Sequence, residues 1–366
     1  MDKTRLFTPG PVPIEKHIRA IGEKQIPYNR TEEFSEFTHE LLLGLKSVFQ
    51  TQGAVALLTS SGTAAMEASV LNFLDSTDKA LIINGGTFGQ RWCALCDIHS
   101  ISYDEYAVPL GAAVDLEQLD DLLANHQYSA LLVNAHETST GHLYDIQSMG
   151  DIARRHEIFF IVDAISTLCA DPFFMDKWHV DVAILSSQKA LALPPGLSFV
   201  AMNHRGIARL NGGTPNSLYF NLKDYLTNQE RGQLPYTPAI GLMMQLHQRL
   251  LDIRQQTLPA LVEVHKQRAE SFRRGLGDLP FDILPARSSN AMTALSCIGL
   301  DAYAVVEELR IRYNIIAAPN SGHLKSKVFR IAHMGAQEDA DVTSLITALK
   351  SIAVPSERII TERIGI

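Results

Sequence analysis

The chain has 366 residues, of which 46% are hydrophobic and 20% are charged, and this composition excludes long intrinsic disorder and a fibrous repeat. The net charge of −8 argues against nonspecific binding to nucleic acid or to an anionic membrane surface. No apolar window is long enough for a membrane span or a signal peptide, and 4 cysteines do not form a disulfide framework, so we expect a cytoplasmic protein of two or three domains.

Short apolar runs alternate with helical patterns through the first two thirds of the chain. The expected strands are 54–59, 80–84, 130–134, 158–163, 182–186 and 197–202, with helices such as 64–74 and 116–125 between them. Several runs are apolar throughout, as in strands that are buried on both faces of a parallel sheet. The alternation predicts an α/β domain with right-handed crossovers. Ligands of such folds bind at the carboxyl ends of the strands, so the polar residues after each run are candidates for a site.

A second region follows a loop-rich stretch over 211–238 and a long helical pattern over 241–276. The elements expected there are strands at 282–284, 292–298 and 328–331 and helices at 301–313 and 339–352. We place a domain boundary at residue 255, inside the long helix. This gives a large domain over 16–255, a small α+β domain over 256–366 and an N-terminal segment over 1–15.

Two residues at strand ends suggest chemistry on a carbonyl group. Lys189 lies between a buried strand and an apolar loop, where desolvation lowers the pKa of an amine and makes it a nucleophile. Asp163 ends another apolar strand, about one strand–helix–strand unit earlier, so the two can lie on neighbouring strand ends. The ordinary alternatives are a surface lysine and a helix-capping aspartate.

The small polar turn Ser61, Gly62 and Thr63 lies between a strand and a helix. Its N–H groups, its hydroxyls and the helix dipole form an anion site, although the turn lacks the glycine spacing of dinucleotide folds and P-loops, so a plain helix cap is the alternative. Pyridoxal phosphate would use this turn, Asp163 and Lys189 together. It needs an anion site, a carboxylate for its ring nitrogen and a lysine for its aldehyde.

Five short motifs, in this order, carry a resemblance to a known family. They are SGTAAME at 61–67, NGGTFGQR at 84–91, HETSTG at 136–141, VDAIS at 162–166 and SSQKAL at 186–191. The chain resembles the class V aminotransferases of pyridoxal phosphate fold type I, in particular the alanine–glyoxylate and serine–glyoxylate branch. The resemblance implies a large, mostly parallel seven-stranded sheet domain, a smaller α+β C-terminal domain, and a homodimer with active sites shared across the interface.

The resemblance also assigns roles around the cofactor. Lys189 would be the Schiff-base lysine, and Asp163 would pair with the pyridinium nitrogen. The residues expected to hold the phosphate are Ser61, Gly62, Thr63 and Gln188.

Three further cofactor contacts follow from the same motifs. Phe88 would stack on the ring, although a core phenylalanine is the alternative, and Thr138 would bond the phenolic oxygen. Thr237 would reach the phosphate of the partner subunit. Gln233 and Leu234 stand near the place where the family has a tyrosine, which leaves a second contact from the partner open.

Substrate contacts are expected from both ends of the chain. Arg330 would bind the substrate carboxylate, because a guanidinium matches a carboxylate bidentately, and a surface salt bridge is the alternative. Gly10 lies in an N-terminal loop that resembles the family's pocket-lining segment. Arg30 is expected at the interface or the pocket, and Asn29 replaces a histidine of many relatives and so could alter substrate choice.

Other polar residues are expected to have structural roles. Cys93 and Cys96 have zinc-like spacing, but no second pair exists, so we expect two thiols packed in a helix and no metal site. His333 either approaches the pocket or has a structural role.

The predicted activity moves an amino group from alanine, serine or aspartate to a 2-oxo acid such as glyoxylate or pyruvate, in ping-pong steps through an aldimine of Lys189. One alternative is a 2-aminoethylphosphonate–pyruvate aminotransferase. A lyase such as a cysteine desulfurase is less favoured, because the last cysteine, Cys297, falls in an expected strand instead of a loop. An inactive cofactor-binding homologue is disfavoured by the presence of Lys189 and Asp163.

Overall fold

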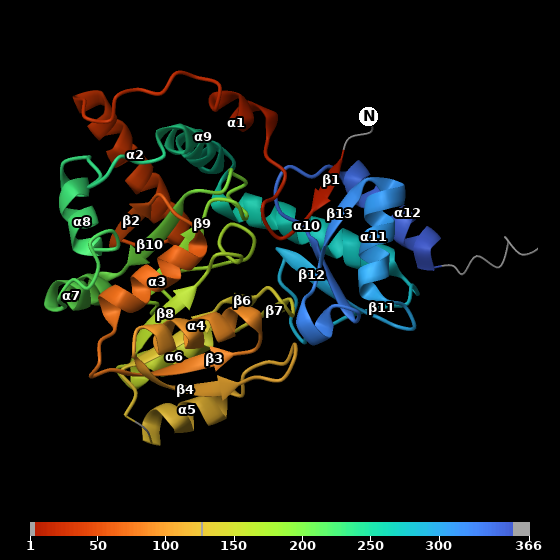
Figure 1. Cartoon of the computed structure of the whole chain (residues 1–366), viewed down its shortest axis with the longest axis horizontal. Coiled ribbons are helices and arrows are strands. Elements are labelled where there is room, and N and C mark those ends of the chain that lie inside the picture. The colour runs from red at the N-terminus through yellow and green to blue at the C-terminus, as the bar shows by residue number, and fades with distance from the viewer. Residues whose placement is uncertain (1–3, 126, 354–366) are drawn as a thin grey trace, which may run out of the picture.

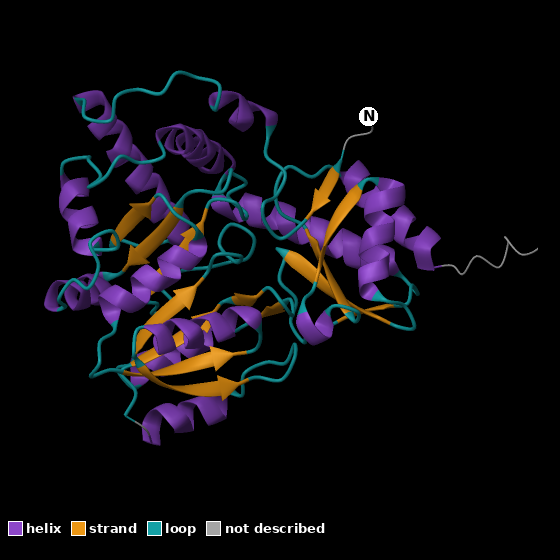
Figure 2. Cartoon of the chain, viewed as in Figure 1, coloured by secondary structure: helices purple, strands orange, loops and turns teal. Residues whose placement is uncertain are grey.

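Two β-sheets organise the chain in a computed structural model that describes residues 4–125 and 127–353 (Figures 1 and 2). The larger sheet has the strand order β2-β10-β9-β8-β5-β3-β4. Its strands are β2 (Ala54–Leu58), β3 (Lys79–Asn84), β4 (Ser102–Ala107), β5 (Ala130–Asn134), β8 (Phe159–Asp163), β9 (Val182–Ser186) and β10 (Ser198–Met202). Only β10 runs antiparallel to its neighbours, so the predicted seven-stranded, mostly parallel sheet is confirmed.

The central strands are buried on both faces, as their apolar sequences predict. Every residue of β5, β8, β9 and β10 is buried. The helices in this part of the chain are α1 (Lys16–Ile21), α2 (Glu32–Phe49), α3 (Gly62–Phe73), α4 (Thr87–Ile98), α5 (Leu116–Asn125), α6 (Ile146–Arg155), α7 (His204–Gly212) and α8 (Leu222–Glu230). The edge strand β4 was not predicted, because its sequence, SYDEYA, is polar and half exposed.

The second sheet has the order β1-β13-β14-β12-β11. It consists of β1 (Arg5–Phe7), β11 (Phe281–Ile283), β12 (Met292–Cys297), β13 (Ile315–Pro319) and β14 (Val328–Ala332), with helices α11 (Ala302–Tyr313) and α12 (Asp339–Ala353). Two of these strands were not predicted: β1, drawn in red, and its parallel partner β13, drawn in blue (Figure 1). Residues 5–7 of the predicted N-terminal segment are therefore part of this sheet.

The single helix predicted over 241–276 is wrong, because two helices occupy this range. α9 (Ile240–Gln256) and α10 (Leu258–Leu276) are separated by Thr257, which has a φ of 72°. The Thr257 hydroxyl accepts a hydrogen bond from the N–H of Ala260 and so caps α10. Pro259 has no N–H and cannot continue the hydrogen bonds of α9. The break lies close to residue 255, and the division of the chain into domains there stays a prediction.

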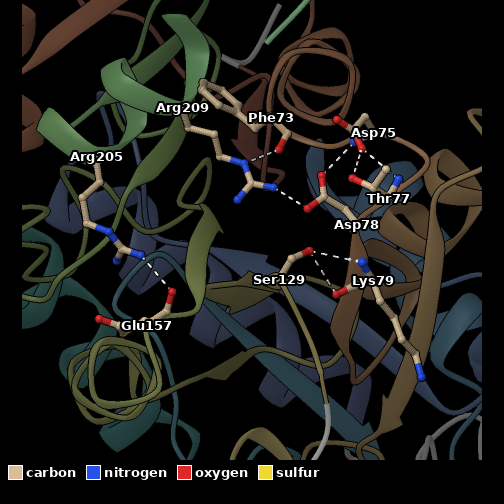
Figure 3. A network of polar contacts seen from close by, with 9 residues as sticks. All are labelled: Phe73, Asp75, Thr77, Asp78, Lys79, Ser129, Glu157, Arg205 and Arg209. Carbon is tan, nitrogen blue, oxygen red and sulfur yellow. Dashed lines mark hydrogen bonds and ion pairs between the residues drawn. The ribbon is translucent and has the colours of Figure 1, made fainter. Parts of the chain in front are cut away.

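The amino edge of the large sheet, where its parallel strands begin, is held by polar contacts (Figure 3). Arg209 on α7 donates from Nε to the carbonyl oxygen of Phe73 at 2.6 Å and from Nη2 to Asp78 Oδ1 at 2.5 Å. The other Asp78 oxygen accepts the N–H of Asp75 at 2.8 Å. These bonds fasten the end of α3 and the start of β3 to α7.

Two more contacts hold the same edge. The N–H of Lys79 donates to Ser129 Oγ at 3.2 Å, which joins the starts of β3 and β5. Arg205 on α7 donates to the carbonyl oxygen of Glu157, just before β8, at 3.0 Å.

Candidate active site

A cavity of about 120 Å³ opens at the opposite, carboxyl edge of the large sheet. Its lining comes from the segments that follow β2, β3, β5, β8 and β9, and consists of Ser61, Gly62, Thr63, Phe88, Arg91, His136, Thr138, Asp163, Ile165, Ser166, Gln188 and Lys189. The resemblance had assigned a role to each of these except Arg91, His136, Ile165 and Ser166, which lie within its motifs. Larger hollows of about 700 and 710 Å³ lie between α2 and α9 and beside β1, but only the small cavity gathers the expected lysine and aspartate.

Lys189 is half-buried and lies three residues after the end of β9. Its Nζ donates to the carbonyl oxygen of Pro9 at 2.7 Å. Burial lowers the pKa of the amine to about 8, while the negative charge of Asp163 opposes this shift. Gly10 lies directly against the lysine, because a Cβ at this glycine would be 2.9 Å from Lys189 Cδ. A fraction of the amine is therefore unprotonated and nucleophilic near neutral pH.

Asp163 ends β8, the neighbouring strand, and is buried. Its Oδ1 accepts the N–H of Ile165 and its Oδ2 accepts from Asn134 Nδ2, both at 2.8 Å. Burial raises the pKa of the carboxyl group to about 6 in spite of these bonds. A cation beside Asp163 would favour the carboxylate form.

A chain of hydroxyl and imidazole groups lines another wall of the cavity. Ser166 Oγ lies 3.0 Å from His136 Nδ1 and 3.0 Å from Thr138 Oγ1. The other ring nitrogen of His136, Nε2, is buried without a partner among the described residues. Burial lowers the pKa of His136 to about 3, so its ring is neutral at physiological pH. The motif HETSTG contained His136, but its role was not anticipated.

The turn after β2 leaves several donors open toward the cavity. Ser61 is the N-cap of α3, yet its side chain makes no capping bond. A Cβ at Gly62 would lie 2.6 Å from Ile165 Cδ1, so a larger residue there would displace the Ile165 side chain. Gln188 Oε1 accepts from Ser186 Oγ at 2.5 Å, which leaves the amide NH₂ of Gln188 to donate elsewhere. Free donors at a helix N-terminus are the kind of groups that can bind an anion.

Phe88 is held by a residue that the sequence did not point to. The buried Glu137 carboxylate accepts the N–H groups of Phe88 at 3.2 Å and of Gly89 at 3.0 Å. It thereby caps the N-terminus of α4, where the helix dipole favours a negative charge. Glu137 fixes the start of the helix that carries the Phe88 ring.

Arg330 comes from β14 of the second sheet. Its Nη2 donates to the carbonyl oxygen of Pro319 at 2.7 Å, and Nη1 lies 3.4 Å from that of Thr138. Its Nε has no partner in the described part of the chain. Burial lowers the pKa of Arg330, and its positive charge lowers that of Lys189. The two sheets therefore place Arg330 close enough to Lys189 to act on it electrostatically.

Some predicted residues lie away from the cavity. Thr237 lines a separate hollow of about 10 Å³. Arg30 donates to Gln233 Oε1 at 2.9 Å and to the carbonyl oxygen of Leu234 at 3.0 Å, near the Thr237 loop. Asn29, which precedes Arg30 in the sequence, is buried.

The remaining predictions concern His333 and the two cysteines of α4. His333 is buried, contacts Thr293 Oγ1 at 2.8 Å and is absent from the cavity lining. Cys93 and Cys96 are buried thiols on α4. Over residues 4–125 and 127–353, no three or more His, Cys, Asp or Glu side chains are grouped to hold a metal ion. Within the same ranges, none of the helices combines the length and apolarity of a membrane span.

A family model and several named relatives indicate the same family. The sequence model described as aminotransferase class-V matches residues 28–334. The chain is 28% identical to the L-aspartate–glyoxylate aminotransferase of Paracoccus denitrificans, over 95% of this chain and 90% of the relative. It is 30% identical to a protein of Synechococcus sp. named soluble hydrogenase, small subunit, over 96% and 93%. The solved structure of alanine–glyoxylate aminotransferase from Nostoc sp. superposes with a TM-score of 0.91 at 27% identity, over 96% of both chains.

Proposed function

The chain belongs to the aminotransferase class-V family, and from this premise we propose that it moves an amino group from aspartate, serine or alanine to glyoxylate or pyruvate with pyridoxal phosphate as its cofactor. The names of its relatives support this choice of substrates, since aspartate, alanine and glyoxylate occur in them. The observation that carries the proposal is the placement of Lys189 and Asp163 on neighbouring strand ends in one cavity.

The open polar atoms of the cavity fit pyridoxal phosphate. The donors after β2 and the Gln188 amide suit its phosphate, and Asp163 suits its ring nitrogen. His136 Nε2, which is buried and has no partner among the described residues, is a polar atom that a ligand could satisfy. Phe88 would stack on the ring and Thr138 would bond its phenolic oxygen. When bound, this cofactor supplies an aldehyde for covalent attachment and a ring that takes up electrons from the substrate's alpha carbon.

Lys189 has two roles in the proposed reaction. Its amine would hold the cofactor, and the same amine, when free, would take the proton from the alpha carbon of the amino acid. A pKa near 8 suits both roles, because the group can be unprotonated and can also hold a proton near neutral pH. The carbonyl oxygen of Pro9, which accepts from Nζ, orients the amine.

Arg330 would bind the carboxylate of either substrate. Its guanidinium keeps its charge when buried and offers donors in one plane, which fixes the orientation of the alpha carbon. A 2-aminoethylphosphonate donor would present its phosphonate to the same group, so this substrate stays an alternative.

Other reactions of this cofactor receive less support. A cysteine desulfurase requires a nucleophilic thiol, and no cysteine lines the cavity in the described part of the chain. Cys297 ends β12 and burial raises its pKa to about 11, which keeps it protonated.

A homodimer is part of the proposal. Thr237 lies in a loop apart from the cavity of its own chain, and next to it Tyr236 stacks on Tyr219 with ring centroids 5.2 Å apart. We propose that this loop reaches the phosphate site of the partner subunit, so that each active site requires two chains.

The test is an absorbance titration of the purified protein with pyridoxal phosphate, followed by alanine, serine, aspartate or 2-aminoethylphosphonate. We expect a visible band from the attached cofactor that one donor removes without any oxo acid, and the fastest donor identifies the substrate. Lys189→Ala should abolish both the band and its response, whereas the exposed Lys266→Ala should leave them intact. Failure of the wild-type protein to form the band would refute the proposed activity.

A further inference from the structure

Arg91 is a cation at the cavity for which the proposed reaction has no role. It lies on α4, one turn after Phe88, and its guanidinium carbon is 4.7 Å from the centroid of the Phe88 ring. Its Nη1 donates to Thr63 Oγ1 at 3.2 Å. Of the described residues that line the cavity, Arg91 and Lys189 are the positively charged ones. In the proposed reaction Lys189 binds the aldehyde of the cofactor, so Arg91 is the positively charged lining residue that is available to an anion.

The bond from Arg91 determines how Thr63 can act. A guanidinium only donates hydrogen bonds, so Thr63 Oγ1 must accept from it. The hydroxyl proton of Thr63 is then free to point to another acceptor. Because Thr63 lines the cavity at the N-terminus of α3, that acceptor would be an anion bound there. Arg91 thus makes Thr63 a donor at the anion site.

The charge of an occupant also requires a counter-charge. A phosphate monoester carries about 1.5 to 2 negative charges at neutral pH, whereas a helix N-terminus offers about half a positive charge. The other groups at the turn, namely the Ser61 and Thr63 hydroxyls and the Gln188 amide, are neutral. Arg91 acts electrostatically on this cavity, since its charge lowers the pKa of both Asp163 and Lys189.

We propose that Arg91 is the counter-ion of the cofactor phosphate within the same subunit, through its own charge and through the hydroxyl of Thr63. This inference rests on the proposed function. The cavity is built for a ligand independently of Arg91, because the fully buried His136 Nε2 faces it without a partner among the described residues.

A purely structural role would have a different signature. If Arg91 only packs on Phe88, its removal disturbs the ring wall and weakens any ligand that stacks there. If Arg91 neutralises phosphate, its removal weakens only ligands that carry phosphate. Pyridoxal and pyridoxal phosphate differ by this group alone, so the pair separates the two roles.

The experiment measures the dissociation constants of pyridoxal phosphate and pyridoxal by fluorescence titration of the apoenzyme. For Arg91→Gln we expect binding of pyridoxal phosphate to weaken by about tenfold to a hundredfold, the range of a charge-assisted hydrogen bond. The dissociation constant of pyridoxal should change by less than about threefold, since pyridoxal has no phosphate to accept such a bond. Arg91→Lys, which keeps the charge, should recover part of the loss. Arg274→Gln, an exposed site on α10, removes the same charge as a control and should change neither constant.

A second comparison tests the route through Thr63. Thr63→Val should weaken the binding of pyridoxal phosphate in the wild-type background. The same substitution should weaken this binding much less in the Arg91→Gln background, because the two side chains act together. If Arg91→Gln does not fold, Thr63→Val and Arg91→Lys decide the matter with the same two ligands.

Two outcomes in a folded Arg91→Gln variant would overturn this inference while leaving the proposed function in place. Either the binding of both ligands weakens equally, or the binding of neither ligand weakens. A wild-type protein that binds neither ligand would instead refute the proposed function, and this inference with it. The two failures are therefore distinguishable from the wild-type titration.

Discussion

The two edges of the large sheet use polar residues in opposite ways. At the amino edge, Arg209 and Asp78 satisfy each other and the neighbouring backbone (Figure 3). At the carboxyl edge, Asn134 Oδ1, His136 Nε2 and the Nε of Arg330 are buried without partners in the described chain. Both edges are formed by the same strands, so the difference comes from the segments that follow and precede them.

This contrast separates residues that stabilise the fold from residues kept for a ligand. A buried polar group without a partner costs about 1 to 3 kcal/mol, and a ligand that bonds it recovers part of this cost. Substitutions at the carboxyl edge should therefore affect function, and those at the amino edge should affect stability.

The largest effect is expected for Arg330→Gln at the carboxyl edge. The loss of a charge-assisted, bidentate contact should lower kcat/KM for both amino donor and oxo acid by about a hundredfold. Steady-state kinetics measures this, and the cofactor absorbance and the thermal midpoint should stay close to wild type. Unchanged kcat/KM for both substrates would show that the carboxylates bind elsewhere.

A smaller effect is expected at the amino edge, from Arg209→Gln. This variant leaves Asp78 and the Phe73 carbonyl oxygen without their donor, which should cost about 2 kcal/mol and lower the thermal midpoint by a few degrees. Differential scanning fluorimetry measures the midpoint, with the exposed Arg274→Gln as the matched control. A normal midpoint together with a fall in kcat/KM would contradict the division between the two edges.

The smallest expected effect is on the pKa of Lys189, which is influenced by the charge of Arg330 from the second sheet. The rate at which the apoenzyme attaches pyridoxal phosphate should rise with pH, with a midpoint at about 8 and a plateau above it, because only the unprotonated amine reacts. Burial, Arg330 and Arg91 lower the pKa of Lys189, and Asp163 raises it, while the neighbouring His136 is neutral. Arg330→Gln removes a lowering charge, so the midpoint should move up by less than about one pH unit.

Stopped-flow absorbance over pH 6 to 10 (about the range that brackets this midpoint) measures the profile. Arg330→Lys keeps the positive charge and should keep the wild-type midpoint. A midpoint that stays constant or falls in Arg330→Gln would mean that the second sheet exerts no electrostatic effect on the lysine.

Sequence patterns alone predicted six of the seven strands of the large sheet and most of the cavity wall. Apolar runs and the motifs that follow them are local signals, because strand burial and turns depend on neighbouring residues in the chain. They located β8 and β9 and thereby placed Asp163 and Lys189 on adjacent strand ends, which the parallel pairing of these strands confirms. The functional roles of these two residues stay predictions.

Contacts between distant segments were decided only by the tertiary structure. These contacts are the pairing of β1 with β13, the Glu137 cap on α4, the bond from Arg91 to Thr63, and the His136–Ser166–Thr138 chain. None has a periodic or local signature, since each depends on how helices and sheets pack against one another. The break at Thr257 belongs with them, because the helical pattern continues across it and the change of direction comes from a positive φ. The local sequence determines which polar groups stand at the carboxyl edge of the sheet. The packing of distant segments determines which of these groups have hydrogen-bond partners.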